Sequence, residues 1–241
     1  MTVGILRMRF IIIGGTSGIG LATASLVKSL GHDVVVAGRD SRKFGAAESL
    51  GASAVALDAS DRDAVKAFFE QQGAFDHLVT TVSGAAGAGL FRTLDLTELK
   101  RGFEMKLFPQ LLTAQAALGT IDARGSITFV GAISSRAQQP GTAGLAAINA
   151  AVEAMVPVLA SELRPLRVNA VVPGVVDTPW WERVGAEQRK TLFAEMTAKV
   201  PAGRVGKPED IAQAILLLAT NTFITGTLID CDGGWKLKSG D

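Results

Sequence analysis

Short apolar runs alternate with helical segments along the whole chain, and this alternation limits the folds that the sequence can adopt. Apolar runs bounded by Gly, Asp or Ser are typical of strands buried on both faces. We expect seven such strands, at Phe10–Ile13, Asp33–Ala37, Ala54–Leu57, His77–Val82, Ser126–Val130, Leu166–Val172 and Thr227–Ile229. Helical periodicity is found between them, at roughly 18–30, 40–50, 61–72, 97–118, 142–163 and 208–220. The alternation predicts an α/β fold, a doubly wound sheet of about seven mostly parallel strands with helices on both faces.

Three segments depart from this regular pattern. Pro109 and Pro157 fall inside predicted helices, where proline removes a hydrogen bond, so we expect kinks or shifted boundaries there. Residues 174–207 have no clear pattern and follow the sixth strand, and loops of that length in compact domains are often lids. We therefore expect 174–207 to cover a substrate site. Since no polar or Pro/Gly/Ser-rich linker interrupts the chain, residues 1–241 are expected to form a single domain.

Charge and composition argue against several classes of protein. Lys and Arg total 24 against 23 Asp and Glu, and the net charge of +1 gives no field that would attract nucleic acid or an anionic membrane. Cys231 alone cannot form an internal disulfide, and His32 and His77 are too far apart to suggest a metal site. The apolar runs are far shorter than the ~20 residues that span a bilayer. We expect a soluble, cytoplasmic protein that binds neither nucleic acid nor membrane.

The first predicted strand runs directly into the turn GGTSGIG and then into a helix. Gly14 permits the tight turn, Gly18 lets the backbone approach a pyrophosphate, and Gly20 lets the helix pack closely on the strand. Such a turn could be a plain tight turn, but its position between the first strand and the first helix is the one that dinucleotide binding requires. The sequence thus predicts a Rossmann-type domain. The candidate cofactor contacts in the turn are Gly14, Thr16, Ser17, Gly18, Ile19 and Gly20.

The end of the second strand bears on the choice of cofactor. NAD-binding sites usually place Asp or Glu there to hold the ribose hydroxyls, whereas Arg accommodates a 2′-phosphate. Gly38 occupies the acidic position here, and Arg39 follows it. We therefore expect NADP(H) rather than NAD(H), the alternative being that Arg39 is a solvated surface charge.

Several motifs in the right order resemble the short-chain dehydrogenase/reductase family over nearly the whole chain. GGTSGIG matches the family's Gly-rich turn, RVNAVVPGVVDTP at 167–179 is similar to the segment after the sixth strand, and 203–234 is a close match to the C-terminal region. The resemblance implies an NAD(P)-dependent oxidoreductase that acts on a small molecule and assembles as a homotetramer or homodimer. The further cofactor contacts that it implies are Asp58, Ala59, Pro173, Gly174 and Thr178.

The family's catalytic residues are where this resemblance fails. The family uses an asparagine in the fourth helix, a serine after the fifth strand, and a Tyr-x-x-x-Lys pair whose ammonium lowers the pKa of the phenol. Aligning PGTAGLAAINAAVEAM, residues 140–155, puts Leu145 at the tyrosine and Asn149 at the lysine. Ala132 stands at the serine position and Lys106 at the asparagine position. The chain contains no tyrosine at all, so none can reach the site from elsewhere.

Polar groups nevertheless remain at these positions. Lysine and asparagine are exchanged, with Lys106 at one position and Asn149 at the other. Because burial depresses the pKa of a lysine, we hypothesise that Lys106 donates the proton or holds a water that does. Alternatively, Lys106 is solvated or paired with Glu104 or Glu153, and Asn149 fills a polar gap. Ser134 would match the family's serine only if the loop slipped.

The expected substrate pocket is partly apolar. Leu145 would form an apolar floor, and Trp180 and Trp181 either line the pocket or pack between subunits. Arg136 either binds an anionic group of a substrate or lies in solvent. We expect an oxidoreductase for a substrate that needs little proton assistance, such as an iminium or an activated alkene, or one that uses Lys106 or a water. The alternative is a catalytically inactive NADP(H)-binding sensor or partner subunit.

Overall fold

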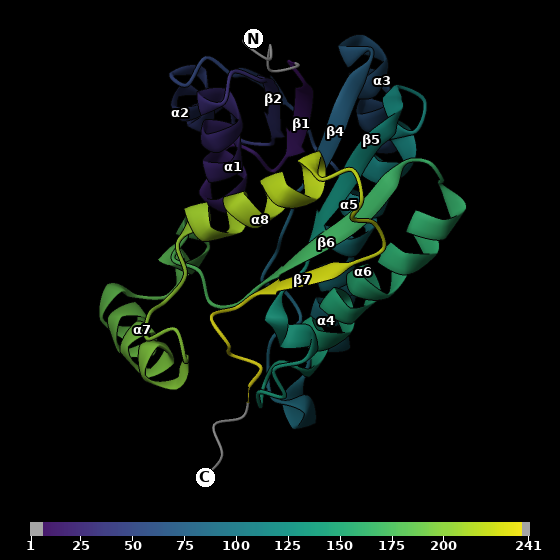
Figure 1. The fold of residues 1–241 in the computed structure, drawn as a ribbon. Helices are drawn as coiled ribbons and strands as arrows, with labels where there is room; N and C mark the ends of the chain where they lie inside the picture. The colour runs from purple at the N-terminus through teal and green to yellow at the C-terminus, as the bar shows by residue number, and fades with distance from the viewer. Residues whose placement is uncertain (1–6, 238–241) are drawn as a thin grey trace.

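Seven parallel strands form one sheet in the computed structural model, which describes residues 7–237 (Figure 1). Their order across the sheet is β3-β2-β1-β4-β5-β6-β7. The predicted α/β class and parallel sheet are confirmed. The strands are β1 Arg9–Ile13, β2 Asp33–Gly38, β3 Ser53–Ala56, β4 Phe75–Thr80, β5 Ile121–Val130, β6 Arg167–Pro173 and β7 Leu228–Cys231.

Helices cover both faces of this sheet. The helices are α1 Gly18–Ser29, α2 Phe44–Glu48, α3 Arg62–Gln72, α4 Leu96–Met105, α5 Leu107–Ala117, α6 Ala143–Glu162, α7 Ala186–Lys199 and α8 Pro208–Thr220. Successive strand residues point to opposite faces, so Ile11 and Ile13 join the core under α3, α5 and α6, whereas Phe10 and Ile12 join the core under α1 and α8. Burial on both faces explains why the strands are nearly continuous apolar runs.

The predicted helix 97–118 is two helices that meet at Lys106. Lys106 has φ −125° and ψ −60°, outside the helical range. Pro109 explains the break, because its ring collides with the carbonyl group four residues earlier, that of Met105. At Pro157 no break occurs, and α6 continues through the proline to Glu162.

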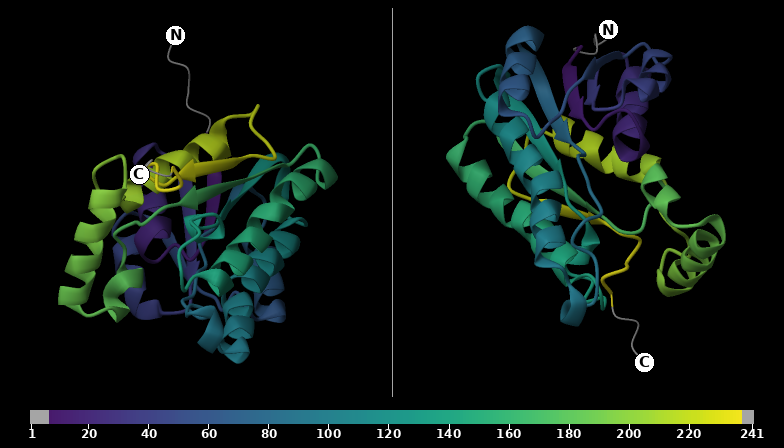
Figure 2. Two further views of the ribbon diagram at one scale, coloured as in Figure 1. Left: turned by 90° about the horizontal axis from the view of Figure 1, so that it is seen from below. Right: turned by 180° about the vertical axis from the view of Figure 1, so that it is seen from behind.

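The segment 174–207 is more regular than the sequence indicated. It contains a short 3-10 helix, η4 Pro179–Arg183, and then α7. Helix α7 stands apart from the sheet in every view (Figure 2), and none of its residues is buried. Its helical pattern was missed because only a few half-buried apolar residues, among them Phe193, turn toward the rest of the chain.

Helix α6, at 20 residues, is long and apolar enough by composition to cross a membrane. Core helices of soluble proteins meet the same criterion. Here α6 packs against β6 and places Val152 and Val156 in the core, so it is a core helix of this fold.

His77 on β4 should make the protein acid-sensitive. Its Nδ1 lies 2.9 Å from Ser126 Oγ, and burial, followed by the charge of Arg167, lowers its pKa to about 4. At pH values between the ordinary pKa of 6.5 and about 4, His77 is protonated in the unfolded chain and neutral in the folded chain. The free energy of unfolding should therefore fall by about 2–3 kcal/mol as the pH drops through this window.

Urea unfolding at pH 7 and pH 4.5 measures this loss. The His77→Gln variant cannot titrate and should lose less stability than the wild type over the same interval. An equal loss in both proteins would mean that His77 titrates normally.

Candidate active site

The Gly-rich turn lies where the strand order reverses. β1 has β2 on one side and β4 on the other, and the chain visits β2 and β3 before it crosses to β4. In sheets of this kind, ligands bind outside the carboxyl ends of the strands at the reversal point. The turn from Gly14 to Gly20 follows β1 directly and therefore occupies that position.

The geometry of the turn fits the pyrophosphate of a dinucleotide. Gly14 and Gly18 have φ of +85° and +51°, which favour glycine. A Cβ on Gly20 would lie 2.4 Å from the carbonyl oxygen of Gly14, so α1 can pack this closely on the turn only with glycine at position 20. Ser17 at the start of α1 makes no capping hydrogen bond, and the first turn contains no acidic residue. The first N–H groups of α1 are thus left without a side-chain acceptor and suit an anionic ligand.

The end of β2 has no room for an acidic side chain. A Cβ on Gly38 would lie 2.8 Å from the hydroxyl oxygen of Thr16, which fills that space. Arg39 is exposed at this edge. The pKa of Asp58 is lowered because Ser60 donates two hydrogen bonds to its carboxylate and because Arg39 lies near it. Arg39 and Asp58 therefore flank the outer end of the site, with Ala59 buried behind them.

Residues from the end of β6 reach the same turn. Gly174, after Pro173, donates its N–H to the carbonyl oxygen of Cys231 at 3.1 Å. Thr178 lies against the turn, since a Cβ on Gly18 would be 3.4 Å from the Cβ of Thr178. The structure thus brings the two ends of the candidate cofactor site together.

Lys106 is buried at the junction of α4 and α5. Its Nζ donates a hydrogen bond to the carbonyl oxygen of Gly131, 3.0 Å away, just past the end of β5. Burial lowers the pKa of Lys106 from 10.5 to about 8, and the charge of Glu153 acts in the opposite direction. Lys106 is therefore not solvated, and Glu104 pairs with Lys100 instead.

Asn149 on α6 and Ser134 in the turn after β5 are in direct contact. Asn149 Nδ2 donates to Ser134 Oγ at 3.0 Å and to the carbonyl oxygen of Leu145 at 2.9 Å. Flipping the amide would set two carbonyl oxygens against each other at Leu145, so this orientation is the consistent one. Asn149 Oδ1 is buried and finds no hydrogen-bond partner among residues 7–237. Ser134 lies on a 3-10 turn, η3 Ile133–Ser135, and its hydroxyl hydrogen stays available to a ligand.

Gln110 is a buried polar residue that sequence analysis missed. It lies one turn after Lys106 on α5, and its Nε2 donates to the carbonyl oxygens of Val82 at 3.1 Å and Val130 at 3.2 Å. Its Oε1 accepts from the hydroxyl of Thr80 at 3.2 Å. Gln110 therefore bridges the ends of β4 and β5 where the two strands separate. The one signal in the sequence is a glutamine in the apolar stretch LFPQLL.

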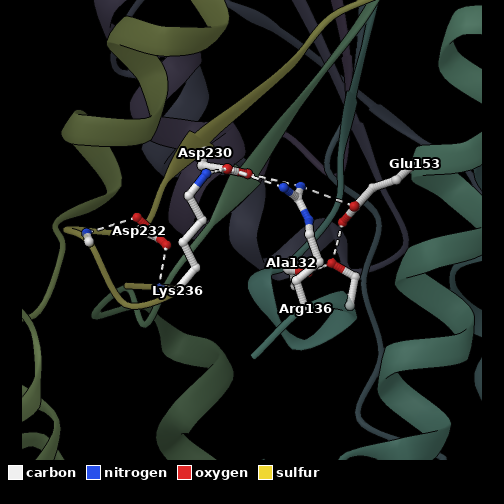
Figure 3. A network of polar contacts seen from close by, with 8 residues as sticks. Ala132, Arg136, Glu153, Asp230, Asp232 and Lys236 are labelled. Atoms are coloured by element: carbon white, nitrogen blue, oxygen red, sulfur yellow. Dashed lines mark hydrogen bonds and ion pairs between the residues drawn. The ribbon is translucent and has the colours of Figure 1, made fainter. Parts of the chain in front are cut away.

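A network of charges surrounds the η3 turn (Figure 3). Glu153 accepts a hydrogen bond from Ser135 Oγ at 2.6 Å and pairs with Arg136 at 3.1 Å. Arg136 also pairs with Asp230 on β7 at 2.8 Å, and Asp230 pairs with Lys236. Arg136 is exposed, as one of the two expectations had it, but two carboxylates engage its guanidinium, a pairing that the sequence did not indicate.

Comparison with known proteins identifies the family. A family model described as enoyl-(acyl carrier protein) reductase matches residues 14–236. The chain belongs to the short-chain dehydrogenase/reductase family. A relative, the cis-4-hydroxycyclohexanecarboxylate dehydrogenase of Sinomonas cyclohexanicum, is 32% identical over 243 residues, covering 93% of this chain and 95% of that one.

Solved structures agree with this assignment. A small-chain dehydrogenase in complex with NADPH is 37% identical, with a TM-score of 0.86, and the match covers 96% of this chain and 99% of that one. The MalC reductase/Diels-Alderase from Malbranchea aurantiaca is 25% identical, with a TM-score of 0.89 and coverage of 97% and 98%. Family membership places this chain among oxidoreductases that bind a nicotinamide cofactor.

In this short-chain dehydrogenase/reductase Trp180 ties segment 174–207 to the loop after β4, and Trp181 makes contacts within the segment. The ring nitrogen of Trp180 donates to the carbonyl oxygen of Gly84 at 3.4 Å, and that of Trp181 to the carbonyl oxygen of Val176 at 3.0 Å. Trp181 also packs edge-on against Phe193 of α7, with ring centroids 5.7 Å apart. Both rings are half-buried, so each still presents a surface to a ligand or a subunit.

Removing the Gln110 amide should destabilise the enzyme. Gln110→Leu leaves the Thr80 hydroxyl and two carbonyl groups without partners, which should lower the free energy of unfolding by about 2–4 kcal/mol. Gln115→Leu, at an exposed position of the same helix, should change it by less than about 0.5 kcal/mol. Urea unfolding compares the two variants, and equal effects would mean that the bridge between β4 and β5 contributes nothing.

Proposed function

We propose that the protein is an NADP(H)-dependent oxidoreductase with a non-standard active site that acts on a partly apolar small molecule. The observation that carries the proposal is the buried ammonium of Lys106. An isolated buried charge is costly, yet this one is held on the carbonyl oxygen of Gly131, just past the end of β5. A group with a pKa of about 8 can give and regain a proton near neutral pH.

The cofactor would be held by groups that already stand in place. The Gly-rich turn and Ser17 at the start of α1 would bind the pyrophosphate, and Arg39 the 2′-phosphate of NADPH. The absence of room at Gly38 supports this preference, because an acidic residue for the ribose hydroxyls of NAD would collide with Thr16. The remaining contacts would come from Thr16, Ile19, Asp58, Ala59, Pro173, Gly174 and Thr178.

When bound, NADPH would supply the hydride that is added to an electrophilic carbon of the substrate. Lys106 would deliver the matching proton, directly or through an ordered water, and Ser134, whose oxygen is held by Asn149, would donate a hydrogen bond to the substrate. Leu145 gives the pocket an apolar contact in place of a phenol. An iminium needs no proton at all, since addition of a hydride yields a neutral amine, and an activated alkene needs one only at carbon.

We further propose a lid over the substrate site and an oligomeric assembly. Segment 174–207, anchored by the contact of Trp180 with Gly84, would act as the lid. A homotetramer or homodimer is supported by the apolar side chains of Phe108 on α5 and Val158 on α6, which are 54% and 60% exposed. The single cysteine, Cys231, is the ground for proposing the reducing cytoplasm as the protein's location. The residues 1–241 would act as one domain.

Arg39 should set the cofactor preference. Arg39→Ala removes a charge-assisted contact to the 2′-phosphate, so the Kd for NADPH should rise about 10- to 100-fold while the Kd for NADH changes little. Arg7→Ala is the control, because Arg7 pairs with Asp33 at the opposite end of β2. Fluorescence titration with each nucleotide measures both constants, and a parallel loss of NADPH and NADH affinity would contradict this role.

Lys106 should be required for turnover of substrates that need a proton. The panel is 2-methyl-1-pyrroline as imine, 2-cyclohexenone as activated alkene and cyclohexanone as ketone, each with NADPH. Lys106→Met should lower kcat for the alkene or ketone that the enzyme reduces by about 100-fold or more, with NADPH affinity unchanged. Wild-type turnover should be constant below about pH 8 and fall above it, as Lys106 loses its proton.

The matched control for Lys106→Met is Lys100→Met on α4, where the lysine is exposed and paired with Glu104. It should leave turnover and binding as they are. Unchanged turnover of the whole panel in Lys106→Met would exclude lysine as the proton donor.

The second candidate function is a cofactor sensor or partner subunit without catalysis. The complete lack of tyrosine favours it, because the family's acid is absent from the chain. Tight NADPH binding with no hydride transfer to any member of the panel would support this function over the first.

A further inference from the structure

Gly131 separates two buried groups of opposite charge. On one side, Lys106 Nζ donates to its carbonyl oxygen at 3.0 Å. On the other side, a Cβ on Gly131 would lie 3.3 Å from Glu153 Oε1. The φ of Gly131 is not in the left-handed region, so its backbone conformation does not require glycine. Glycine at this position therefore leaves room for the carboxylate of Glu153, which a larger side chain would crowd.

Glu153 is held firmly where it is. It is 6% exposed, and its two oxygens are engaged by the Ser135 hydroxyl at 2.6 Å and the Arg136 guanidinium at 3.1 Å (Figure 3). Beyond Arg136 the charges continue outward through Asp230 on β7 to Lys236. The signs alternate from the interior to the surface, so the buried carboxylate has its partners on its outer side and lies next to Gly131, whose carbonyl oxygen binds Lys106.

We propose that Glu153 is a positioning residue for Lys106, the buried counter-charge across Gly131 that keeps this lysine in its ammonium form. The inference rests on the proposed role of Lys106 as proton donor. A buried ammonium whose only contact is a carbonyl oxygen would discharge, because burial favours the neutral amine. A carboxylate across one glycine restores the charged form at neutral pH without the close ion pair that would immobilise the proton.

Glu153 is the charged group that faces Lys106 from the packed elements in the described part of the chain. It comes from α6, whereas Arg136 lies on the far side of Glu153 and is occupied by Asp230. On the lysine's own side of the fold, Glu104 is paired with Lys100. Within residues 7–237, Glu153 is thus the acid whose charge acts on Lys106.

The same carboxylate also fixes the turn that carries Ser134. It binds Ser135, the next residue, while Asn149, one helical turn before Glu153 on α6, binds Ser134 itself. Two neighbouring turns of α6 thus form hydrogen bonds with two neighbouring residues of η3, Ser134 and Ser135. Glu153 thereby holds both polar groups of the proposed reaction, Lys106 through charge and Ser134 through the backbone of the turn.

The test is a titration of Lys106 in the full-length protein, which requires no substrate. Lysine labelled with ¹³C at Cε is followed by NMR against pH, and Lys106→Met assigns the signal. In Glu153→Gln the pKa of Lys106 should fall by about one unit or more. Glu153→Asp, which keeps the charge but withdraws it by one methylene, should give a smaller fall and serves if the first variant does not fold.

The control is Glu162→Gln, the same change at an exposed acid near the end of α6, which should leave the titration of Lys106 where it is in the wild type. An unchanged Lys106 titration in Glu153→Gln and Glu153→Asp overturns the proposal. So does an equal shift in Glu162→Gln.

Turnover separates this inference from the proposed function. For a panel substrate that needs a proton, the pH at which the rate begins to fall should move down in Glu153→Gln by the same amount as the Lys106 titration. If Lys106→Met retains full turnover, the role of Lys106 as proton donor fails, whereas the titration still decides whether Glu153 holds its charge.

Discussion

A parallel sheet covered on both faces leaves polar side chains little room within it and gathers most of them at the ends of its strands. The strands here are largely apolar on both sides, with Phe10 and Ile12 in one core and Ile11 and Ile13 in the other. Every polar group of the candidate site therefore comes from a segment that follows a strand or from a helix that passes a strand end. The backbone groups freed where β4 and β5 separate must also be satisfied there, and Gln110 and Lys106 both do so.

The features that could be predicted from the sequence are those that depend on neighbouring residues. The strand pattern and the Gly-rich turn are local, and so is the effect of Pro109, whose ring breaks the helix at a fixed distance along the chain. The fold class and the position of the turn followed from these features. The ion pairs of Arg136 could not be predicted because its partners, Glu153 and Asp230, come from α6 and β7, and no local pattern joins them. Helix α7 was missed for a related reason, since a helix that buries nothing leaves a weak periodic signal.

Lys106 can be buried in this fold because two neighbouring groups, one neutral and one charged, stabilise its ammonium. The carbonyl oxygen of Gly131 satisfies one of its three protons, and a carboxylate opposes the loss of its charge. Asn149 lies one helical turn before Glu153 on α6 and binds Ser134. Because its amide carries no charge, it does not compete with Lys106 for the carboxylate of Glu153. The exchange of lysine and asparagine thus preserves the number of buried positive charges.

The contact between Gly38 and Thr16 links two positions that the chain separates by a helix and a strand. Any side chain at position 38 must displace the hydroxyl or methyl group of a buried threonine. An acid introduced at position 38 alone would strain the Gly-rich turn, and a smaller residue at position 16 alone would open a void with nothing to fill it. The two positions are therefore epistatic: an acidic side chain can be accommodated at this edge only if both positions change together, and the proposed preference for NADP(H) would be hard to reverse one substitution at a time.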